Sequence, residues 1–351
     1  MQAVQFDSFG EAPYVTDVPE PVAEPGGVVI RVEATGLCRS DWHGWQGHDP
    51  AIATLPHVPG HEFAGVVEQV GAGVERVRVG ERVVVPFVCG CGTCEVCRAG
   101  HSHVCPRQWQ PGFSGPGSFA ERVAIPWADA NVVPLPDEVG FDVAAGLGCR
   151  FATAYRGIVD VGQVTEGEQV AVFGCGGVGL AAVMVAASRG ARVVAVDVNP
   201  DALSLAEEVG ASVTVDGSSP SLVDQVRQAT GGGAQLTVDA LGLVETVRSA
   251  VLSLRVRGRH VQIGLLPPVV VQDRATVPMH IVIAQELQVL GSHGMPARDY
   301  PRLLADIAAG RLQPGRFITR TIGMHEAPQA LAALSGPAAP GVTVIRPGAD
   351  R

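Results

Sequence analysis

The chain has 351 residues, of which 46% are hydrophobic and 17% charged, so it is long enough for two domains and apolar enough to bury a core. This composition excludes a disordered chain. The formal net charge is -10, with only 25 Lys and Arg residues, and the pI is near 5.4. Nucleic-acid binding needs clustered basic side chains, so these values argue against it and predict a small-molecule partner.

The stretch before residue 151 consists of short alternating segments divided by Pro and Gly. Val28–Glu33 and Gly65–Val70 alternate apolar and polar residues, which predicts antiparallel strands with one face in water. We expect this half to be mostly strand and loop. The first ten residues, MQAVQFDSFG, show neither the basic nor the apolar segment of a secretory signal, so cytoplasm is the expected location.

After residue 151, apolar strands alternate with helical stretches. Six strands with helices between them predict an α/β fold with a complete doubly wound parallel sheet. The expected strands are Val170–Phe173, Val193–Val196, Val213–Val215, Leu236–Val238, His260–Ile263 and Leu287–Leu290. The expected helices include Pro200–Val209, Ser221–Ala229 and Leu243–Leu254. The uncharged run 170–187 contains four glycines, which predicts a strand, a loop and a helix instead of a membrane span.

The last part of the chain holds two further helical segments, Tyr300–Ala309 and Glu326–Leu334. These segments are too short to form a domain alone. We therefore expect the tail to pack on one of the two preceding domains.

A glycine-rich loop follows the first strand of the second half. It reads Gly174-Cys175-Gly176-Gly177-Val178-Gly179. A helix opens directly after this loop, so its N-terminus can face a pyrophosphate. Asp197 closes the next strand and can hydrogen-bond both ribose hydroxyls, whereas a 2′-phosphate about 4 Å away would cost on the order of 4 kcal/mol at an effective dielectric near 20. The sequence therefore predicts NAD in preference to NADP.

Cysteines form two sets with metal-ligand spacing. The first set follows C-x2-C-x2-C-x7-C and consists of Cys91, Cys94, Cys97 and Cys105, while Cys38, His61 and Glu62 lie upstream. A closed four-thiolate site and an incomplete mixed site together predict a structural metal and a catalytic metal. Free thiols with this spacing, in a chain too large to need disulfide bonds, are typical of a reducing compartment.

The four-cysteine segment leaves alternatives open. A ferredoxin-type cluster would need a final gap of three residues, and the gap here is seven, so zinc fits better. Cys89 could replace Cys105 as a fourth thiolate. His101 and His103 lie inside the segment and could ligate in principle, but four thiolates already close a site.

Several runs together resemble the zinc-dependent alcohol dehydrogenases of the medium-chain dehydrogenase/reductase family. They are residues 36–43 (GLCRSDWH), 60–62 (GHE), the four-cysteine segment, 149–155 (CRFATAY) and 173–179 (FGCGGVG). The resemblance spans nearly the whole chain. It implies a mostly-β, GroES-like catalytic domain of residues 1–150, completed by 290–351, and a Rossmann NAD-binding domain of residues 151–289 with the six-stranded sheet.

The resemblance also implies two zinc ions per chain. Cys38, His61 and Cys149 match the ligands of the catalytic zinc, and Glu62 matches an acidic neighbour that ligates it transiently. Two thiolates and an imidazole leave one tetrahedral position open for substrate. The family pattern assigns the structural zinc to Cys91, Cys94, Cys97 and Cys105 and leaves Cys89 as a bystander.

Further roles follow from the same resemblance. Asp41 matches the carboxylate that fixes the tautomer of His61. Ser40 and His43 match a relay in which the substrate proton passes through Ser40 and the cofactor ribose to an imidazole. The implied cofactor contacts are Arg39, Thr153, Gly174, Gly176, Gly177, Val178, Gly179 and Asp197. A homo-oligomer, dimer or tetramer, is also expected.

The implied activity is the reversible oxidation of a primary or secondary alcohol to an aldehyde or ketone with NAD. A polyol or amino-alcohol dehydrogenase is the alternative, although Cys149 stands where the polyol enzymes usually have Glu. A zinc-free reductase of the same fold would lack Cys38 and His61, and a non-enzymatic NAD-binding redox sensor would need no open metal site. Trp42, Trp45, Phe87 and Trp109 flank the metal motifs, and Trp45 is the expected wall of an apolar substrate pocket unless it packs the interior.

Overall fold

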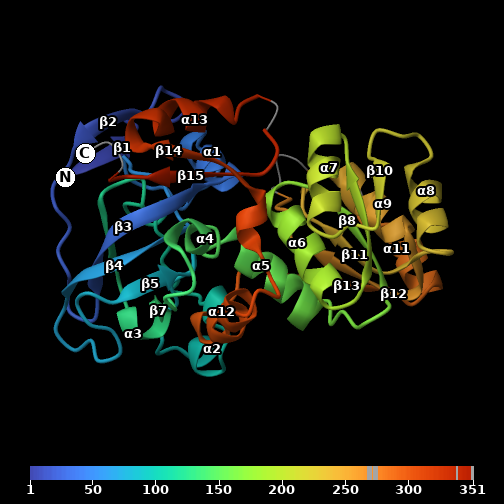
Figure 1. Ribbon diagram of the computed structural model, residues 1–351, viewed down its shortest axis with the longest axis horizontal. Helices are drawn as coiled ribbons and strands as arrows, with labels where there is room; N and C mark the ends of the chain where they lie inside the picture. The colour runs from blue at the N-terminus through green and yellow to red at the C-terminus, as the bar shows by residue number, and fades with distance from the viewer. Residues whose placement is uncertain (267–270, 272–275, 337–338, 349–351) are drawn as a thin grey trace. The chain divides into compact units, whose positions relative to one another are not determined.

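The computed structural model describes residues 1–266, 271, 276–336 and 339–348. The chain divides into two compact units (Figure 1). Unit 1 comprises Met1–Ala152, Gly294–Gly310 and Ile318–Arg351, and unit 2 comprises Thr153–His293 and Arg311–Phe317. The domain limits given above remain a prediction. Their segment 290–351 includes residues 337–338 and 349–351, which lie outside the described residues.

Unit 2 contains a six-stranded sheet in which every pairing is parallel. Its strand order is β10 (Val213–Asp216), β9 (Arg192–Asp197), β8 (Gln169–Phe173), β11 (Ala234–Asp239), β12 (Leu254–Gln262) and β13 (Gln288–Gly291). All six predicted strands are confirmed. The central strand β8 is an apolar run because helices cover both faces of a parallel sheet.

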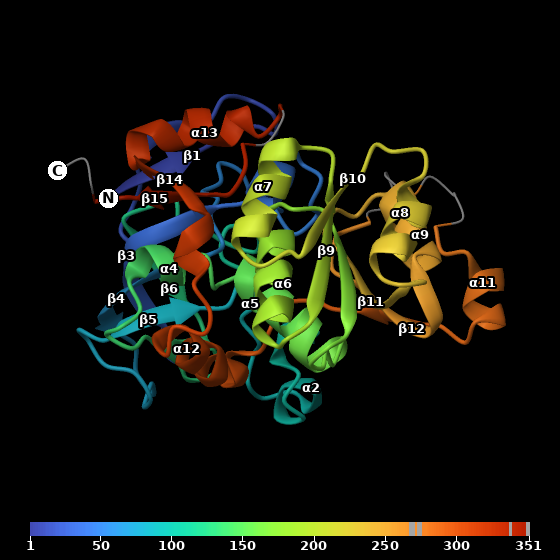
Figure 2. The same ribbon diagram turned by 45° about the vertical axis from the view of Figure 1, so that its right-hand side comes forward.

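The helices of unit 2 lie on opposite faces of this sheet. Figure 2 shows α6 (Gly177–Ser188) and α7 (Pro200–Glu208) on one face, and α8 (Leu222–Ala229) and α9 (Val244–Leu252) on the other. Local sequence sets where α7 begins, because the Asn199 side chain caps the Asp201 amide at 2.9 Å and Pro200 occupies the first turn. The described residues of unit 2 also form η2 (Gly157–Val161), α11 (Met279–Ala284) and η4 (Pro314–Phe317).

Unit 1 is built on a seven-stranded, mostly antiparallel sheet (Figure 1). Its main path is β14 (Ile318–Gly323), β15 (Val342–Arg346), β3 (Val28–Leu37), β4 (Phe63–Val70), β5 (Arg82–Val85) and β7 (Val133–Pro134), with β6 (Arg122–Ile125) also paired to β3. A separate hairpin joins β1 (Gln2–Gln5) and β2 (Tyr14–Asp17). The predicted antiparallel pairing of the first half is confirmed for β3 and β4, whereas β14 and β15 of the tail pair in parallel.

The expectation of one wet face holds only for the middle of β3, where Arg31 pairs with Glu68 of β4 at 3.1 Å. Only Arg31 and Glu33 of this strand are partly exposed. The side chains of β3 belong to two core clusters of unit 1. Leu37 packs with Phe6 and Phe119 in one cluster, and Val28, Ile30 and Val32 pack with residues of other strands in the second. Helix α4 (Phe141–Ala145) also packs against β3 and β4. The half-polar alternation in the sequence thus reflects two charged side chains on a mostly buried strand.

Short helices complete unit 1. They are α1 (Arg39–Trp45), α2 (Glu95–Arg98), η1 (Ser102–Val104), α3 (Ala128–Asn131), η3 (Ala297–Asp299), α12 (Tyr300–Ala308), η5 (Met324–Glu326) and α13 (Ala327–Ala333). Helix α5 (Arg150–Arg156) begins in unit 1 and ends in unit 2. The predicted tail helices correspond to α12 and to η5 with α13, and they lie in unit 1.

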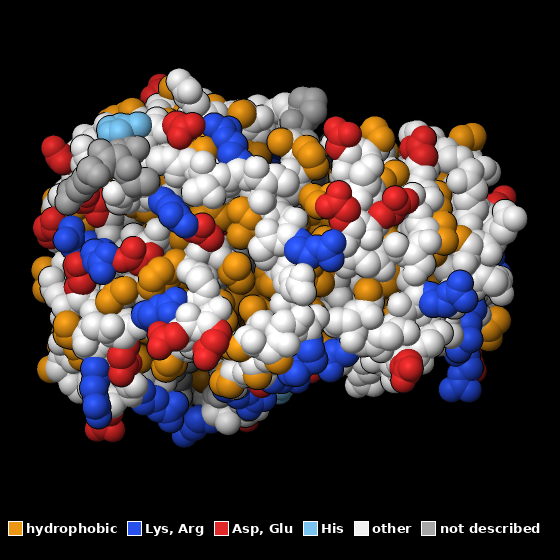
Figure 3. All heavy atoms as spheres, viewed as in Figure 1, with side chains coloured by type: hydrophobic (Ala, Val, Ile, Leu, Met, Phe, Trp, Pro, Cys, Tyr) orange, Lys and Arg blue, Asp and Glu red, His pale blue; other side chains and the backbone are white. Residues whose placement is uncertain are grey.

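The described part of the chain has no helix that combines the length and the apolar character needed to cross a membrane. On the face seen in Figure 3, acidic and basic side chains are interspersed. Exposed ion pairs of this kind, such as Arg346 with Asp142 at 2.5 Å, contribute little to stability because water and salt screen them.

Candidate active site and metal centres

Three metal-ligand side chains from distant parts of unit 1 meet at one point. The donor atoms of Cys38, His61 and Cys149 all lie within 4.8 Å of one another. Cys38 follows β3 and caps α1, His61 lies two residues before β4, and Cys149 directly precedes α5. Sheet pairing of β3 with β4 therefore brings the first two residues together, and the turn before α5 adds the third.

The donor set fits a zinc ion. His61 is fully buried and its Nε2 atom has no hydrogen-bond partner among the described residues. A buried nitrogen without a hydrogen-bond partner destabilises the folded state unless it binds a ligand. The Cys149 hydrogen bond lowers the pKa of the Cys38 thiol well below its ordinary value, while the pKa of Cys149 is raised. A metal ion would displace the proton that these two sulfur atoms share.

Asp41 fixes the orientation of His61. Its Oδ1 atom lies 2.7 Å from His61 Nδ1, and both side chains are buried. The same carboxylate accepts the backbone amides of Cys38 at 2.9 Å and Gly60 at 3.2 Å. A carboxylate accepts hydrogen bonds, so Nδ1 carries a proton and Nε2 is the nitrogen left to bind a metal.

Glu62 lies beside the cluster but is paired with a cation. Arg150 Nε is 2.6 Å from Glu62 Oε1, and the Arg150 amide donates to Glu62 Oε2 at 3.3 Å. Arg150 also donates to the Leu37 carbonyl at 3.0 Å. Burial raises the pKa of Glu62, and the charge of Arg150 opposes that shift. The sequence analysis did not identify Arg150, although it directly follows Cys149 in the chain.

Tyr300 supports the turn that carries Cys149. Its hydroxyl donates to the carbonyls of Leu147 at 3.0 Å and Gly148 at 3.3 Å, and the side chain is fully buried. Tyr300 starts α12 in the C-terminal tail. The tail thus buttresses a candidate ligand, a role that the sequence analysis did not assign to any tail residue.

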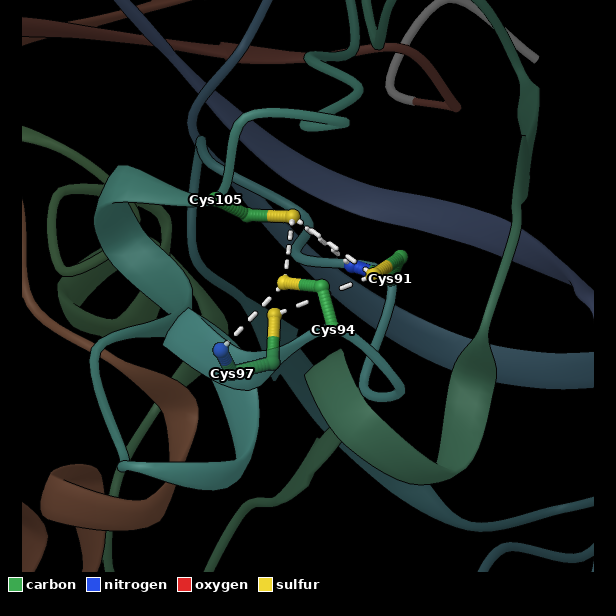
Figure 4. A group of neighbouring side chains, drawn as sticks. All are labelled: Cys91, Cys94, Cys97 and Cys105. Atoms are coloured by element: carbon green, nitrogen blue, oxygen red, sulfur yellow. Dashed lines mark hydrogen bonds between the residues drawn. The ribbon is translucent and has the colours of Figure 1, made fainter.

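The four-cysteine segment forms a second candidate metal centre (Figure 4). Sγ–Sγ distances are 3.6 Å for Cys91–Cys105, 3.7 Å for Cys94–Cys105 and 3.9 Å for Cys91–Cys97. A tetrahedron with Zn–S bonds of about 2.3 Å has edges of roughly 3.8 Å, which these distances match. The sulfur atoms therefore already lie at the corners of a zinc-sized site.

Polar donors surround these sulfur atoms. The Cys97 amide donates to Cys94 Sγ at 3.4 Å, and Arg107 Nη2 lies 3.1 Å from Cys91 Sγ. Cys89 is apart from this group, because its buried thiol donates to the Pro86 carbonyl at 3.7 Å. His101 and His103 are likewise not part of the gathered group. All eight cysteines are free.

Ser40 and His43 lie on α1, directly after Cys38. The Nδ1 atom of His43 is 3.1 Å from Nδ1 of His48, a residue that the sequence analysis did not single out. Burial lowers the pKa of His43, and the nearby charges of His48 and Arg39 lower it further. Arg39 donates to the Leu334 carbonyl and its guanidinium lies 4.4 Å from the centre of the Trp42 ring.

The glycine-rich loop of unit 2 lies between β8 and α6 as expected. A Cβ atom on Gly179 would lie 1.7 Å from the Gly174 carbonyl oxygen, whereas one on Gly176 would meet nothing within 4 Å. Gly179 therefore closes the turn, and Gly176 leaves open space at the start of the helix. Val178 belongs to the first turn of α6, and Thr153 is buried in α5.

Asp197 stands at the end of β9, next to this loop. Its Oδ2 atom accepts the Cys175 amide at 2.6 Å, and Oδ1 accepts the Asn199 amide at 2.9 Å. Val198, the next residue, is 70% exposed. The carboxylate is thus fixed at the loop with an open surface beside it, a geometry suited to a ribose diol.

Two aromatic rings pack against His61. The Phe113 ring centroid lies 5.3 Å and the Phe87 centroid 6.2 Å from the imidazole. Phe87 was one of the aromatic candidates, and Phe113 was missed. Trp45, the expected pocket wall, instead packs in a core cluster and donates to the Glu11 carbonyl at 2.6 Å. Trp45 is only 5% exposed, so it packs in the interior, which was the alternative to a role as a pocket wall.

Comparison with known proteins agrees with these features. The signature of the alcohol dehydrogenase GroES-like domain matches residues 24–137, and that of the zinc-binding dehydrogenases matches residues 177–309. An alcohol dehydrogenase of Geobacillus stearothermophilus is 33% identical over 89% of this chain and 90% of its own length. An L-threonine 3-dehydrogenase of Rhizobium johnstonii is 33% identical, with 89% of each chain covered.

Among solved structures, an NAD-dependent alcohol dehydrogenase superposes with a TM-score of 0.88 and 31% identity, covering 99% of this chain and 100% of that one. Sequence identity above 30% over most of both chains establishes the relationship. The chain belongs to the zinc-dependent alcohol dehydrogenases of the medium-chain dehydrogenase/reductase family.

Proposed function

We propose that this protein is a zinc-dependent alcohol dehydrogenase that oxidises primary or secondary alcohols reversibly to aldehydes or ketones, with hydride transfer to NAD. The observation that carries this proposal is the orphaned Nε2 of His61 beside two cysteine sulfur atoms. That donor set suits a metal with one coordination position left for substrate. We assign the metal chemistry to unit 1 and cofactor binding to unit 2.

In this proposal, Cys38, His61 and Cys149 would hold a zinc ion, which would supply the Lewis acid that lowers the pKa of the substrate hydroxyl. Asp41 keeps the Nε2 lone pair of His61 available. Ser40 receives the hydroxyl proton and hands it on toward the His43 imidazole, which acts as the general base. Glu62 is the acidic neighbour of the site, and its pairing with Arg150 supports a role outside the permanent ligand set.

We assign a second, structural zinc to the other cysteine cluster. Its ligands are Cys91, Cys94, Cys97 and Cys105. Four thiolates leave no position for substrate, so this ion would act by holding the loop between β5 and β6 in shape. Cys89, His101 and His103 take no part in this assignment.

We assign the cofactor site to the loop between β8 and α6. The open space at Gly176 suits a pyrophosphate at the helix N-terminus, with Gly174, Gly177, Val178 and Gly179 forming the rest of the loop. Asp197 would hold the ribose of the adenosine half and reject a 2′-phosphate. Arg39 and Thr153 are kept as further cofactor contacts on the basis of the family pattern.

The proposed substrate class is a small uncharged alcohol. Phe87 and Phe113 place apolar surface against the ligand His61, which suits a hydrocarbon substituent. An amino-alcohol dehydrogenase is the second candidate, because a relative named L-threonine 3-dehydrogenase is as similar as the alcohol dehydrogenases. A polyol substrate is less favoured, given Cys149 as the third ligand candidate.

We further propose a cytoplasmic homo-oligomer. Among the described residues, β13 is the last strand of its sheet, and nearby apolar side chains are exposed: Ile283 at 73%, Met279 at 54% and Val289 at 41%. An exposed strand edge with an apolar surround is typical of a subunit interface. Eight free cysteines support a reducing compartment.

The test of the proposed function is a substrate panel with purified, zinc-loaded protein and NAD. Primary, secondary and aromatic alcohols are compared with sugar alcohols and with L-threonine by NADH formation. The proposal predicts the highest kcat/KM for an uncharged alcohol. A clear preference for L-threonine would select the second candidate, and a preference for sugar alcohols would reject the proposed substrate class.

A further inference from the structure

A helix cap in unit 1 places two histidines side by side. Helix α1 ends at Trp45, and Gly47 adopts a left-handed conformation with φ of 74°. The His48 amide donates to the His43 carbonyl at 3.0 Å, and the Gly47 amide donates to the Gly44 carbonyl at 2.9 Å. These two bonds are the Schellman pattern, which folds the chain back over the last turn of the helix.

The backbone turn therefore brings the His48 ring next to His43. Their Nδ1 atoms lie 3.1 Å apart, and their ring centroids 5.4 Å apart. Trp42 contacts both rings edge-on, with centroid distances of 4.9 Å to His43 and 5.6 Å to His48. The pair is thus fixed by the backbone cap and by a shared aromatic neighbour.

A hydrogen bond between two Nδ1 atoms needs one proton between them, so one neutral ring donates and the other accepts. If His43 donates, its Nε2 atom has a free lone pair and can accept a proton. If His48 donates instead, Nε2 of a neutral His43 carries hydrogen and cannot act as a base. The choice of donor decides whether His43 is competent for alcohol oxidation.

We propose that His48 is a positioning residue that accepts the Nδ1 proton of His43 and so holds His43 in the tautomer of a general base. The inference rests on the proposed function of His43. It parallels the relation between Asp41 and His61 in the same unit, where an acceptor at Nδ1 leaves Nε2 free. During oxidation, His43 Nε2 gains the hydroxyl proton, and the resulting imidazolium keeps its Nδ1 hydrogen bond to His48.

His48 differs from Asp41 in being neutral when it accepts. A carboxylate in the position of His48 would strongly favour the imidazolium form of His43. A neutral imidazole favours that form less, so water can deprotonate His43 rapidly. The other titratable or charged groups that act on His43 are Arg39, Asp49 and Cys38. His48 is exposed, so solvent reaches the pair.

Two substitutions separate hydrogen bonding from packing. His48→Phe keeps a ring against Trp42 but has no acceptor, whereas His48→Asn places an oxygen near the position of Nδ1. Near neutral pH, His48→Phe should lower kcat for alcohol oxidation about 3- to 10-fold, as expected for partial loss of one positioned acid–base group, and His48→Asn should recover most of the loss. His48→Phe added to His43→Gln should cause no further decrease.

A second readout does not depend on turnover. Nitrogen-15 NMR of the zinc-loaded protein with labelled histidine reports which nitrogen of His43 carries the proton. The proposal predicts Nδ1–H for His43 in the wild type and in His48→Asn, and mixed tautomers in His48→Phe. Nε2–H for His43 in the wild type, or equal turnover in all three proteins, would overturn it. A wild type that oxidises no alcohol but shows Nδ1–H refutes the proposed activity and leaves the pairing intact.

Discussion

Asp41 Oδ1 lies 2.7 Å from Nδ1 of His61, and neither side chain reaches solvent. This contact determines which imidazole nitrogen can bind a metal, because the carboxylate accepts a hydrogen bond from the protonated nitrogen, Nδ1. The same carboxylate binds the amides of Cys38 and Gly60. Asp41 thus fixes the backbone of one candidate zinc ligand, Cys38, and the ring of another, His61.

Replacing Asp41 by Asn should weaken zinc binding without unfolding the protein. An amide keeps one acceptor but loses the charge that favours the required tautomer, and such changes typically cost about 10- to 100-fold in metal affinity. Competition with a chelator measures the affinity of the exchangeable zinc. Asp49→Asn, a carboxylate on the same segment that accepts the Ala51 amide, is the matched control and should leave zinc affinity unchanged.

Removing Arg150 should destabilise unit 1. Above about pH 8, where Glu62 is ionised, Arg150→Met leaves this buried carboxylate without its partner, and breaking a buried ion pair on one side typically costs about 3 to 5 kcal/mol. The free energy of unfolding in urea measures this loss. The double variant with Glu62→Gln should recover a large part of it, and a double variant as unstable as Arg150→Met would contradict the pairing.

Elemental analysis of freshly purified protein should find about two zinc ions per chain, one of which chelators remove readily. Cys149→Ala should lose the exchangeable ion and abolish turnover while the chain stays folded. Cys94→Ala should reduce thermal stability more than it affects the chemistry of the surviving folded protein. A wild-type content of one zinc would remove either the structural or the catalytic assignment.

Catalytic efficiency with NAD should exceed that with NADP by about a hundredfold or more. Repulsion between Asp197 and a 2′-phosphate is on the order of 4 kcal/mol, and since about 1.4 kcal/mol corresponds to a factor of ten, about 2.8 kcal/mol of it suffices for a hundredfold difference. Asp197→Gly combined with Val198→Arg should narrow the gap. This variant also loses the hydrogen bond to the Cys175 amide, so its kcat with NAD should fall as well.

Alcohol oxidation should rise with pH through a pKa below the ordinary imidazole value of about 6.5, because burial lowers the pKa of His43 and only the neutral ring accepts a proton. Protonation at low pH removes the base, so the rate falls there. His43→Gln should slow oxidation about 10- to 100-fold near neutral pH and recover partly with added base. Ser40→Ala should be slower still.

The role of His43 in the relay is tested under conditions in which hydride transfer limits the rate. A deuterium isotope effect identifies conditions in which hydride transfer limits the rate. If His43→Gln then keeps the wild-type rate and pH profile, the assigned role of His43 is wrong.

The sheet of unit 2 could be predicted because parallel strands covered on both faces appear as apolar runs. For β3 the prediction of one wet face held only in part, since Arg31 and Glu33 are partly exposed and the rest of the strand is buried. An alternation of apolar and polar residues indicates the polarity of the side chains. It does not indicate which helices cover the sheet. Helix α4, which packs on β3, left no such signal.

Cys38 and His61 could be proposed from their residue types, but Cys149 came only from family resemblance, because a residue so far along the chain follows no spacing rule. Their neighbours Arg150 and Tyr300 were missed for a related reason. Their roles depend on a tertiary approach to Glu62 and to the carbonyl of Leu147. His48 did have a local signal, since a glycine just after a short helix predicts the cap that returns the chain to that helix.

The most direct test of the account follows hydride from substrate to cofactor. Purified protein with two zinc ions per chain is given NAD and an alcohol deuterated at the hydroxyl-bearing carbon, and the reduced cofactor is examined by mass spectrometry. The account predicts one deuterium per molecule of NADH and an equal amount of aldehyde or ketone, with neither product formed by Cys149→Ala. Protein that holds zinc and NAD yet forms no labelled NADH from any alcohol of the panel would contradict it.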